Sequence, residues 1–477
     1  MTTSESNPAL TGRRAALFGQ VFSAVCLLAA LAAAPYFDSL TRVLLVLSTF
    51  LFAIVCRYSV RYMMGDPGQA RFTFWLTLTG LCVFALVLAG NLLLFAAAWC
   101  GISLSLHQLL QFYSNRPGAI LAARKKFLIS RLGDAALALA LVLTCRQFGS
   151  WEFREIFAAA DTLRPAGPEH LPAGISWICG ALVFAALLKS AQFPFHSWLP
   201  DTMETPTPVS ALMHAGVINA GGILIIRLSP LVSLSDFALF VLAITGGFTA
   251  LFASFTMLTQ ASVKRCLAFS TVAQMGFMML ECGLGAFHLA LLHLVAHSLY
   301  KAHAFLSTGS VVAAPAKDSW SPVHPAVAAL CSLTAFAVSL GAAFALGVDP
   351  LDQPLLTGIF SLALAQLFCR AGASPDRAWR FPAGLAAGAV LAVAYFALER
   401  LAGLAVAPLR TESNWYGLPV LALFLLFAVV QTQVPRLAGS SFAQKLFVHA
   451  RNGFYFNTLA NRFTRALWPL TVPQEGI

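Results

Sequence analysis

Long apolar runs recur along nearly the whole chain, and short polar stretches separate them. A helix that crosses a membrane needs about 20 mainly apolar residues, and on that criterion the pattern predicts twelve to fourteen spanning helices. The candidate runs lie near residues 15–34, 40–56, 72–90, 92–112, 127–145, 174–193, 207–228, 235–258, 265–281, 284–312, 324–348, 351–369, 382–399 and 417–434. The predicted fold class is therefore an all-α polytopic membrane protein.

The composition agrees with this pattern and excludes several classes of protein. Of the 477 residues, 59% are hydrophobic and 10% are charged, whereas soluble domains have about 45 to 50% apolar and about 25% charged residues. A soluble enzyme, a disordered chain and a nucleic-acid-binding module are therefore excluded. The ten cysteines form no CxxC pair, so we predict neither a disulfide framework nor a metal site, and no cofactor.

The distribution of Lys and Arg predicts the topology. Counted over the predicted loops together with the adjoining helix ends, 20 of the 30 lie in the N-terminus, the even-numbered loops and the C-terminus, 7 in the odd-numbered loops and 3 in helix interiors. The positive-inside rule then places both termini on the cytoplasmic side of the inner membrane. We expect a cytoplasmic N-terminus at 1–14, a membrane domain at 15–435 and a cytoplasmic amphipathic tail at 436–477. The basic loop at 113–126 is interpreted as a topology signal.

Ionisable residues at membrane depth cost about 2.5 to 3.5 kcal/mol each on insertion scales, so each needs a partner, water or a function. Arg131 and Asp134 are three residues apart on one helix and can pair. Lys189 precedes Pro194 by five residues, which predicts that the helix breaks just past the lysine and exposes its last carbonyls to a hydrated cavity. His214 falls about two turns inside the next apolar run.

One predicted helix carries a stripe of titratable side chains. His293, His297 and Lys301 recur every four residues, and one helical turn rises about 5.4 Å. Their polar groups therefore form a ladder that suits proton transfer, because neutral imidazoles relay protons. The alternative is that they form three hydrogen bonds between helices. We favour transport, and we expect His288 and His303 at the membrane interface or off the stripe.

Four stretches of the chain resemble one known family. They are KKFLISRLGD (125–134), KSAQFPFHSWLPDTMETPTPVSALMHA (189–215), VKRCLAFSTVAQMGF (263–277) and HLVAHSLYKAHAFLSTGSV (293–311). They are similar to segments of the antiporter-like subunits of NADH-quinone oxidoreductases and of multi-subunit sodium/proton antiporters. The resemblance covers about residues 57–312. It implies a helical bundle of two inverted repeats with discontinuous helices and a polar axis at half-membrane depth. It also implies proton-path roles for the matching residues, which are Lys189, His214, His293, His297 and Lys301, with Arg131 and Asp134 as an ion pair.

The chain departs from that family at two places. Where the family carries a glutamate paired with the channel lysine, this chain reads Trp99, Cys100, Gly101, so Asp134 or His107 is the expected substitute. After residue 312 the chain lacks the lysine-bearing broken helix and the long lateral helix of the respiratory subunit. In these departures the chain resembles the membrane subunits of inorganic-carbon accumulation complexes. Two segments add to this resemblance, SLHQLLQFYSNRPGAILAARKKF and VHARNGFYFNTLANRFTR.

That second resemblance implies a partner, and the predicted topology indicates a coupling point. The partner is a large cytoplasmic subunit similar to a zinc carbonic anhydrase, and ion flow through the membrane subunit drives its hydration of CO2 to bicarbonate. His196, Asp201 and Glu204 follow the broken helix, and we predict that their loop couples the two subunits. The chain itself is expected to be a transporter subunit and not an enzyme.

Three classes of function remain open from the sequence. The first is an ion-conducting subunit of an inorganic-carbon transporter, the second a cation/proton antiporter or respiratory proton pump, and the third a non-conducting membrane anchor. The conducted ion is also open, since the histidine ladder suits protons whereas backbone carbonyls at the predicted break suit Na+.

Overall fold

The computed structural model describes residues 8–166, 170–311, 324–350, 352–373, 377–407, 417–437 and 439–469. The all-helical fold class is confirmed: within these ranges the only strand-like feature is an isolated bridge between Asn91 and Glu152. The long helices are α1 (Pro8–Ala33), α2 (Ser39–Tyr62), α3 (Gln69–Val87), α4 (Leu92–Leu110), α5 (Pro117–Phe148), α7 (Ala173–Lys189), α11 (Asp236–Met257), α12 (Val263–Gly283), α13 (Phe287–Leu306), α15 (Pro325–Ala345), α16 (Pro354–Ala373), α17 (Arg377–Gly403) and α18 (Gly417–Leu437).

Short helices connect or flank the long ones. They are α6 (Phe153–Leu163), α8 (Thr207–Ala215), α9 (Ala220–Arg227), α10 (Ser229–Val232), α14 (Thr308–Val311), α19 (Ser441–Arg451) and α20 (Phe456–Leu467). By length and composition, eleven helices in the described part of the chain can cross a membrane, and α8 with α9 counts as one of them. The apolar helices α7 and α18 are shorter. The predicted run 284–312 forms α13, whose four histidines and one lysine make it less apolar than the others.

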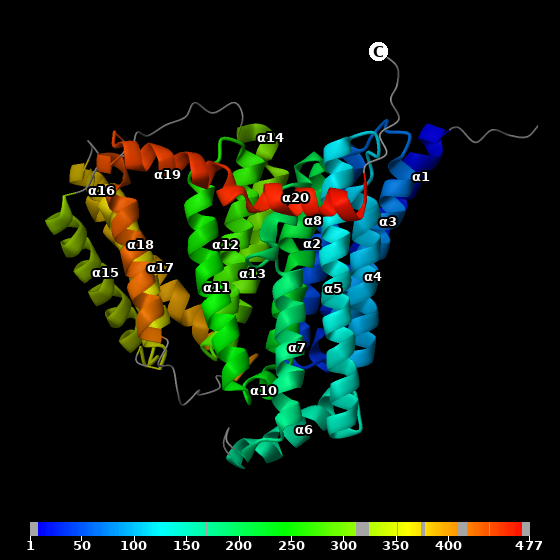
Figure 1. Ribbon diagram of the computed structural model, residues 1–477, viewed down its shortest axis with the longest axis horizontal. Coiled ribbons are helices and arrows are strands. Elements are labelled where there is room, and N and C mark those ends of the chain that lie inside the picture. Colours follow the sequence, from blue (N-terminus) through cyan, green and yellow to red (C-terminus); the bar gives the residue numbers. More distant parts are fainter. Residues whose placement is uncertain are drawn as a thin grey trace, which may run out of the picture.

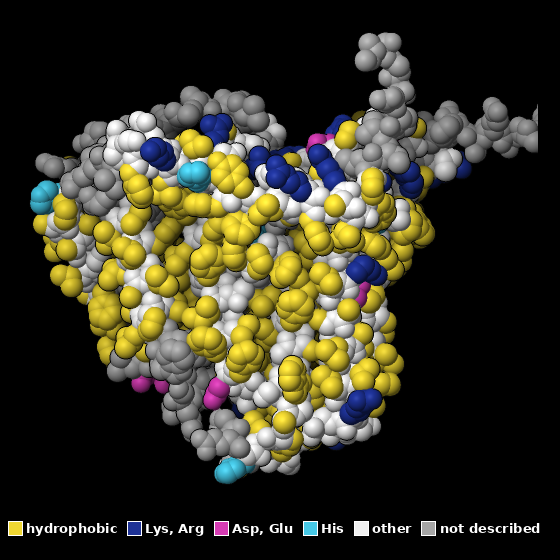
Figure 2. Space-filling model, viewed as in Figure 1, with side chains coloured by type: hydrophobic (Ala, Val, Ile, Leu, Met, Phe, Trp, Pro, Cys, Tyr) yellow, Lys and Arg dark blue, Asp and Glu magenta, His cyan; other side chains and the backbone are white. Residues whose placement is uncertain are grey.

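The long helices lie side by side and run between two ends of the molecule (Figure 1). At one end, here called the terminal end, α1 begins and α19 and α20 lie across the bundle; α6 and α10 lie at the opposite end. Figure 2 shows a broad band of hydrophobic side chains around the middle, with most Lys and Arg on this face gathered along the terminal end. This distribution agrees with the charge pattern from which the topology was predicted.

The predicted basic loop at 113–126 is largely helical. α5 begins at Pro117, so Lys125 and Lys126 lie inside its third turn, and both side chains are buried. The interpretation of these two lysines as loop charges was therefore wrong. The physical reason is that each ammonium group finds buried oxygen acceptors, described below, which a hydropathy profile cannot register.

Two chain breaks meet inside the bundle. α7 ends at Lys189, as the sequence predicted, and the chain is interrupted again between α8 and α9, where Gly216 adopts φ −126° and ψ −71°. Ser190 Oγ donates to the carbonyl of Ile218 at 3.0 Å and so joins the two breaks. A side chain at Gly221 would place its Cβ against Ser190 Oγ, closer than any real contact, so this close approach requires glycine.

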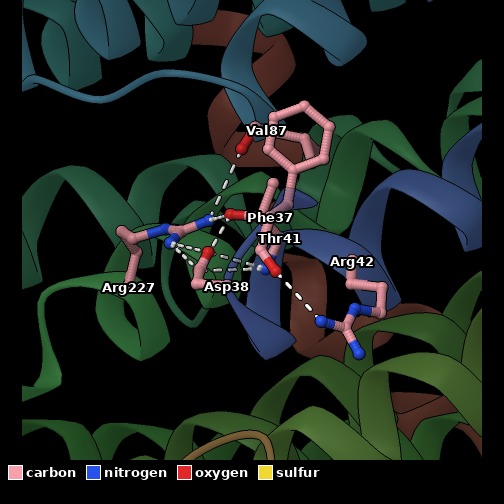
Figure 3. A network of polar contacts seen from close by, with 6 residues as sticks. All are labelled: Phe37, Asp38, Thr41, Arg42, Val87 and Arg227. Atoms are coloured by element: carbon pink, nitrogen blue, oxygen red, sulfur yellow. Dashed lines mark hydrogen bonds and ion pairs between the residues drawn. The ribbon is translucent and has the colours of Figure 1, made fainter. Parts of the chain in front are cut away.

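A polar network at the opposite end anchors the second half of the broken helix (Figure 3). Arg227, the last residue of α9, donates to Asp38 Oδ2 at 3.0 Å, to Thr41 Oγ1 at 2.6 Å and to the carbonyl of Val87 at 3.4 Å. Asp38 also caps α2 by accepting from the backbone N–H of Thr41. The network therefore holds the ends of α2, α3 and α9 together.

Replacing Asp38 by asparagine is expected to reduce stability only where the carboxylate is charged. Burial by itself raises the pKa of Asp38, but hydrogen bonds from Thr41 and the charge of Arg227 outweigh it and hold that pKa below its ordinary 3.8. A lowered pKa stabilises the folded state above the unfolded-state pKa, and this contribution is lost as the pH falls through the folded-state pKa.

Because Asp38 is half exposed, we expect D38N to cost about 1 kcal/mol or less at pH 7. The difference from the wild type should shrink as the pH approaches 3. Thermal unfolding in detergent at both pH values measures it. Asparagine can still cap the helix, so a difference that persists unchanged at pH 3 would assign the loss to packing instead of charge.

Candidate ion-conducting site

Lys189 is buried at the end of α7 and its ammonium group faces α4. Nζ donates to the carbonyl of Trp99 at 3.2 Å and to Ser103 Oγ at 2.8 Å, and it lies 4.3 Å from the centre of the Trp99 ring. Lys126 Nζ donates to the carbonyl of the same Ser103 at 2.7 Å. Two buried lysines therefore converge on one residue of α4 and have neutral oxygen acceptors. Lys126 was missed because its sequence neighbours made it look like a loop charge.

The predicted ion pair on α5 is present. Arg131 Nη2 lies 2.6 Å from Asp134 Oδ2. Asp134 also lies within electrostatic range of Lys189 and of Cys100, the residue at the place of the family's glutamate. His107 contacts Gln111 and packs against Phe127 of α5. Of the two predicted substitutes for the glutamate, Asp134 is the one that the structure brings near Lys189.

His214 lies in the last turn of α8, directly before the second break. Its ring is fully buried, stacks on Phe305 with centroids 4.2 Å apart, and makes a 3.1 Å contact with Thr271 Oγ1 through Nδ1. His297 Nε2 donates to the His214 carbonyl at 3.2 Å, so the ladder on α13 reaches the break.

Asn219, which the sequence reasoning missed, also ties the second break to α13. Its amide donates to the carbonyl of Ala215 at 2.9 Å and to Ser298 Oγ at 2.8 Å. An asparagine in an otherwise apolar run was the available signal, because a buried amide needs hydrogen-bond partners.

The three residues of the predicted stripe lie on one helix, α13. Lys301 is buried and donates to the carbonyl of Leu267 at 3.1 Å. The rings of His293 and His297 have centroids 6.3 Å apart. His293 Nδ1 lies 3.1 Å from Glu281 Oε2 of α12. Glu281 was missed, although it is the only acid in the predicted run 265–281 and that fact was available in the sequence.

The two remaining histidines of α13 differ from each other. His303 is exposed, in agreement with its place off the stripe. His288, the second residue of α13, lies near a helix end and is buried inside the protein, where its Nε2 is 3.7 Å from Glu399 Oε1 of α17. A carboxylate 111 positions later in the chain accounts for its burial, and only the packing of α17 against α13 reveals that partner.

The predicted coupling loop does not form one acidic cluster with its histidine. Asp201 pairs with Lys125 at 2.6 Å and accepts from Asn457 Nδ2 of α20 at 2.9 Å. His196 is instead buried among aromatic rings, including Phe456 of α20 at 6.4 Å. The loop is thus covered by α20, because aromatic and amide groups of α20 complement it.

Glu204 is the exposed member of the predicted coupling loop. It lies against the first turn of α5, where a Cβ added at Gly118 would collide with Glu204 Oε1. Arg116 donates to its backbone carbonyl at 3.3 Å. In the described part of the chain, no group of three or more His, Cys, Asp or Glu side chains is arranged to hold a metal ion.

Comparison with protein families gives two matches. Residues 89–325 match the model described as NADH:quinone oxidoreductase/Mrp antiporter, TM. Residues 30–73 match the model described as NADH-Ubiquinone oxidoreductase (complex I), chain 5 N-terminus. The first match covers the two chain breaks and the stripe on α13.

Two solved structures share the fold. The structure of the Mrp complex from Dietzia sp. superposes with a TM-score of 0.59 at 23% identity and covers 98% of this chain and 56% of that chain. The membrane-bound sulfane sulfur reductase, an archaeal respiratory membrane complex, superposes with a TM-score of 0.55 at 18% identity and covers 92% of this chain and 76% of that chain. The chain thus has an Mrp antiporter-like fold.

Named relatives narrow the family further. NADH-ubiquinone oxidoreductase chain 5 of Arabidopsis thaliana is 37% identical and covers 68% of this chain and 48% of that protein. The "Probable inorganic carbon transporter subunit DabB" of Hydrogenovibrio crunogenus is 37% identical, covering 91% and 84%. The "Probable inorganic carbon transporter subunit DabB2" of Halothiobacillus neapolitanus is 41% identical, covering 91% and 80%. The chain therefore belongs to the DabB inorganic carbon transporter subunits, a branch of the proton antiporter and NADH-quinone oxidoreductase membrane subunit family.

Proposed function

We propose that this chain conducts protons across the cytoplasmic membrane and so drives the hydration of CO2 to bicarbonate by a large cytoplasmic zinc subunit of the DabA type. The observation that carries the proposal is the pair of chain breaks beside buried Lys189, from which a line of imidazoles continues along α13. The relatives named as inorganic carbon transporter subunits support the choice of substrate. The chemistry on CO2 belongs to the partner.

The partners of the buried lysines favour ion conduction over a purely structural role. Lys125 has a carboxylate partner, Asp201, which fixes its charge. Lys189 and Lys301, in contrast, donate to carbonyl and hydroxyl oxygens. An ammonium group with neutral acceptors gives up less interaction energy when it releases its proton than one paired with a carboxylate. These two lysines are therefore suited to exchange protons, whereas Lys125 is suited to hold the fold.

The histidines favour protons over Na+ as the conducted ion. His293 and His297 each have one ring nitrogen engaged with a protein oxygen. The other nitrogen of each ring is buried without a protein hydrogen-bond partner in the described part of the chain. An imidazole with one engaged and one available nitrogen can accept a proton on one side and release one on the other.

The terminal end is the cytoplasmic side in this proposal. The partner binds at α20, and its binding acts on the channel through that helix. Asn457 of α20 bonds Asp201, and Lys125 Nζ donates to Asn457 Oδ1 at 2.5 Å. Lys125 is the neighbour of Lys126, which shares Ser103 with Lys189. Partner binding at α20 would thus reach the channel lysine through α5. The outer stripe of α20, Leu459, Phe463 and Leu467, is exposed and suits lipid or partner contact.

Replacing His297 by alanine should lower proton transport at least tenfold, whereas H303A should lower it less than twofold. His297 contacts both His293 and the break at His214, while His303 is exposed two residues off the stripe. Proton uptake into vesicles that contain the purified complex measures the effect. Equal losses at the two positions would indicate that the substitutions act by disturbing the packing of α13 and not by blocking proton conduction.

Purifying the tagged chain from its native host separates the first two classes of function, and a growth test identifies the third. A large soluble zinc protein as the main companion supports the proposal. A set of small membrane subunits would instead indicate a cation/proton antiporter or a respiratory pump. Growth of the host in air that is unchanged by replacing Lys301 with methionine would indicate a non-conducting anchor.

A further inference from the structure

A second group of titratable side chains lies at the opposite end of the bundle, away from the lysines. Two imidazole–carboxylate pairs form it: His293 with Glu281 at 3.1 Å, and His288 with Glu399 at 3.7 Å. All four side chains are at least 88% buried. We refer to these four residues, together with Tyr395 of α17, as the opposite-end cluster.

Tyr395 connects the two pairs. It lies one turn before Glu399 on α17, within electrostatic range of both Glu399 and Glu281. Its ring is stacked on Phe360 of α16, with centroids 4.2 Å apart and planes 13° from parallel. The phenol is therefore within electrostatic range of carboxylates from two different helices, which relates the two pairs to each other.

The cluster continues the stripe on α13 and reaches the helix ends. His293 belongs to both, because its ring lies 6.3 Å from that of His297. Glu281 is two residues from the end of α12 at Gly283, and His288 is the second residue of α13. Glu399 is four residues from the end of α17 at Gly403. These helix ends lie away from α19, α20 and the start of α1 (Figure 1).

Both imidazoles have a nitrogen available for exchange. His293 Nδ1 and His288 Nε2 face the carboxylates, whereas His293 Nε2 and His288 Nδ1 are buried without a protein hydrogen-bond partner among the described residues. A buried polar atom without a partner is unusual in native proteins. Two such atoms in one cluster, each on a ring that touches a carboxylate, suit a proton-binding group better than a static contact between helices.

We propose that the opposite-end cluster is the proton-access site of the conducting path on the side of the membrane away from the termini, with Glu399 as the residue that the C-terminal helices contribute to it. The inference deepens the proposed function and rests on it. In this proposal the helices after residue 312, which lack a lysine-bearing break, contribute a carboxylate to the path.

The proton transfer balances without any other reactant. A proton that arrives at His293 Nε2 makes an imidazolium; the ring then releases its Nδ1 proton to the Glu281 carboxylate and becomes neutral again. The Tyr395 hydroxyl can donate its proton to one carboxylate while it accepts one from the other carboxylic acid. His288 completes the exchange between Glu399 and the opposite-end surface, and the reverse sequence serves flow in the other direction.

Neighbouring titratable groups do not replace these residues. Cys282 is buried beside Glu281 in α12. Arg400 follows Glu399, but its guanidinium donates to the carbonyl of Leu346 at 2.7 Å and is thereby directed toward α15. Asp236, in the first turn of α11 at the same end, is exposed and serves as a matched control carboxylate.

The test uses the complete complex in lipid vesicles that contain a pH-sensitive dye, with a potassium diffusion potential to drive proton flow. E281Q and E399Q should each lower the flux at least tenfold, and D236N should change it less than twofold. E399D, which restores the charge, should restore a large part of the flux. Y395F should lower the flux severalfold, because it removes the hydroxyl that passes protons between the two carboxylates and leaves the ring in place.

Two comparisons make the result decisive. Wild-type flux in E281Q and E399Q, alongside loss in K189M, would overturn the access site and leave the proposed function standing; wild-type flux in K189M would contradict the proposed function itself. A structural role is identified by thermal unfolding of the same samples. If E399Q loses flux only together with folded protein, and E399D restores folding without flux, the cluster holds α17 in place and the proposal is wrong.

Discussion

Replacing Lys189 by methionine is expected to abolish proton flux and energy-dependent carbon uptake while the protein still folds. Methionine keeps most of the volume and removes a buried charge whose hydrogen bonds go to the Trp99 carbonyl and to Ser103 Oγ. Because these acceptors are neutral, methionine also removes the cost of burying a charge without a directly bonded carboxylate. We expect at least a hundredfold loss of flux with a melting temperature close to that of the wild type. Growth of a CO2-requiring host in air is the cellular measurement.

Lys189→Arg should fail as well, although it keeps the charge. Guanidinium stays protonated at any physiological pH and cannot release its proton. A path that needs only a fixed positive charge at this position would tolerate arginine, so the pair of variants distinguishes titration from simple electrostatics. Growth in air with either variant at the wild-type rate would contradict the assignment of Lys189 as the titrating centre.

The second large effect is expected from Asp201→Asn, which should lower the stability of the folded protein. Lys125 is 2% exposed and has Asp201 as its carboxylate partner. Removing one member of a buried ion pair leaves an uncompensated charge, which costs about 3 kcal/mol at the lower end of the range for such pairs. Because Asp201 also accepts from Asn457, we expect α20 to become more accessible to protease in the variant.

A double-mutant cycle separates the lost charge from other effects of the substitution. The variant D201N/K125M removes both charges and should regain much of the lost stability, whereas additive losses would show that the pair is not coupled. Glu204→Gln is the matched control on the same loop, since Glu204 is exposed; it should change the free energy of unfolding by less than about 0.5 kcal/mol. Thermal unfolding of the solubilised complex is measured for the wild type, for the single variants D201N, K125M and E204Q, and for the double variant.

Much of the site was predictable because charges inside apolar runs are costly. That cost singles out Lys189, His214 and the α13 stripe from the sequence alone, and the structure places them around two adjacent chain breaks. The same reasoning failed at Lys126, because a hydropathy window assigns a lysine near the end of an apolar run to the loop. The structure shows instead that α5 continues through it and that Ser103 accepts its hydrogen bond.

The sequence by itself determined the helical membrane class, the approximate helices and the break after Lys189, since each depends on local composition or on a proline a few residues away. Only the tertiary structure decided which polar groups meet. His288 with Glu399, and Asp201 with Asn457, are 111 and 256 positions apart. Such partners follow from how α17 and α20 pack against the bundle, and no local pattern encodes a contact between segments that apolar packing brings together.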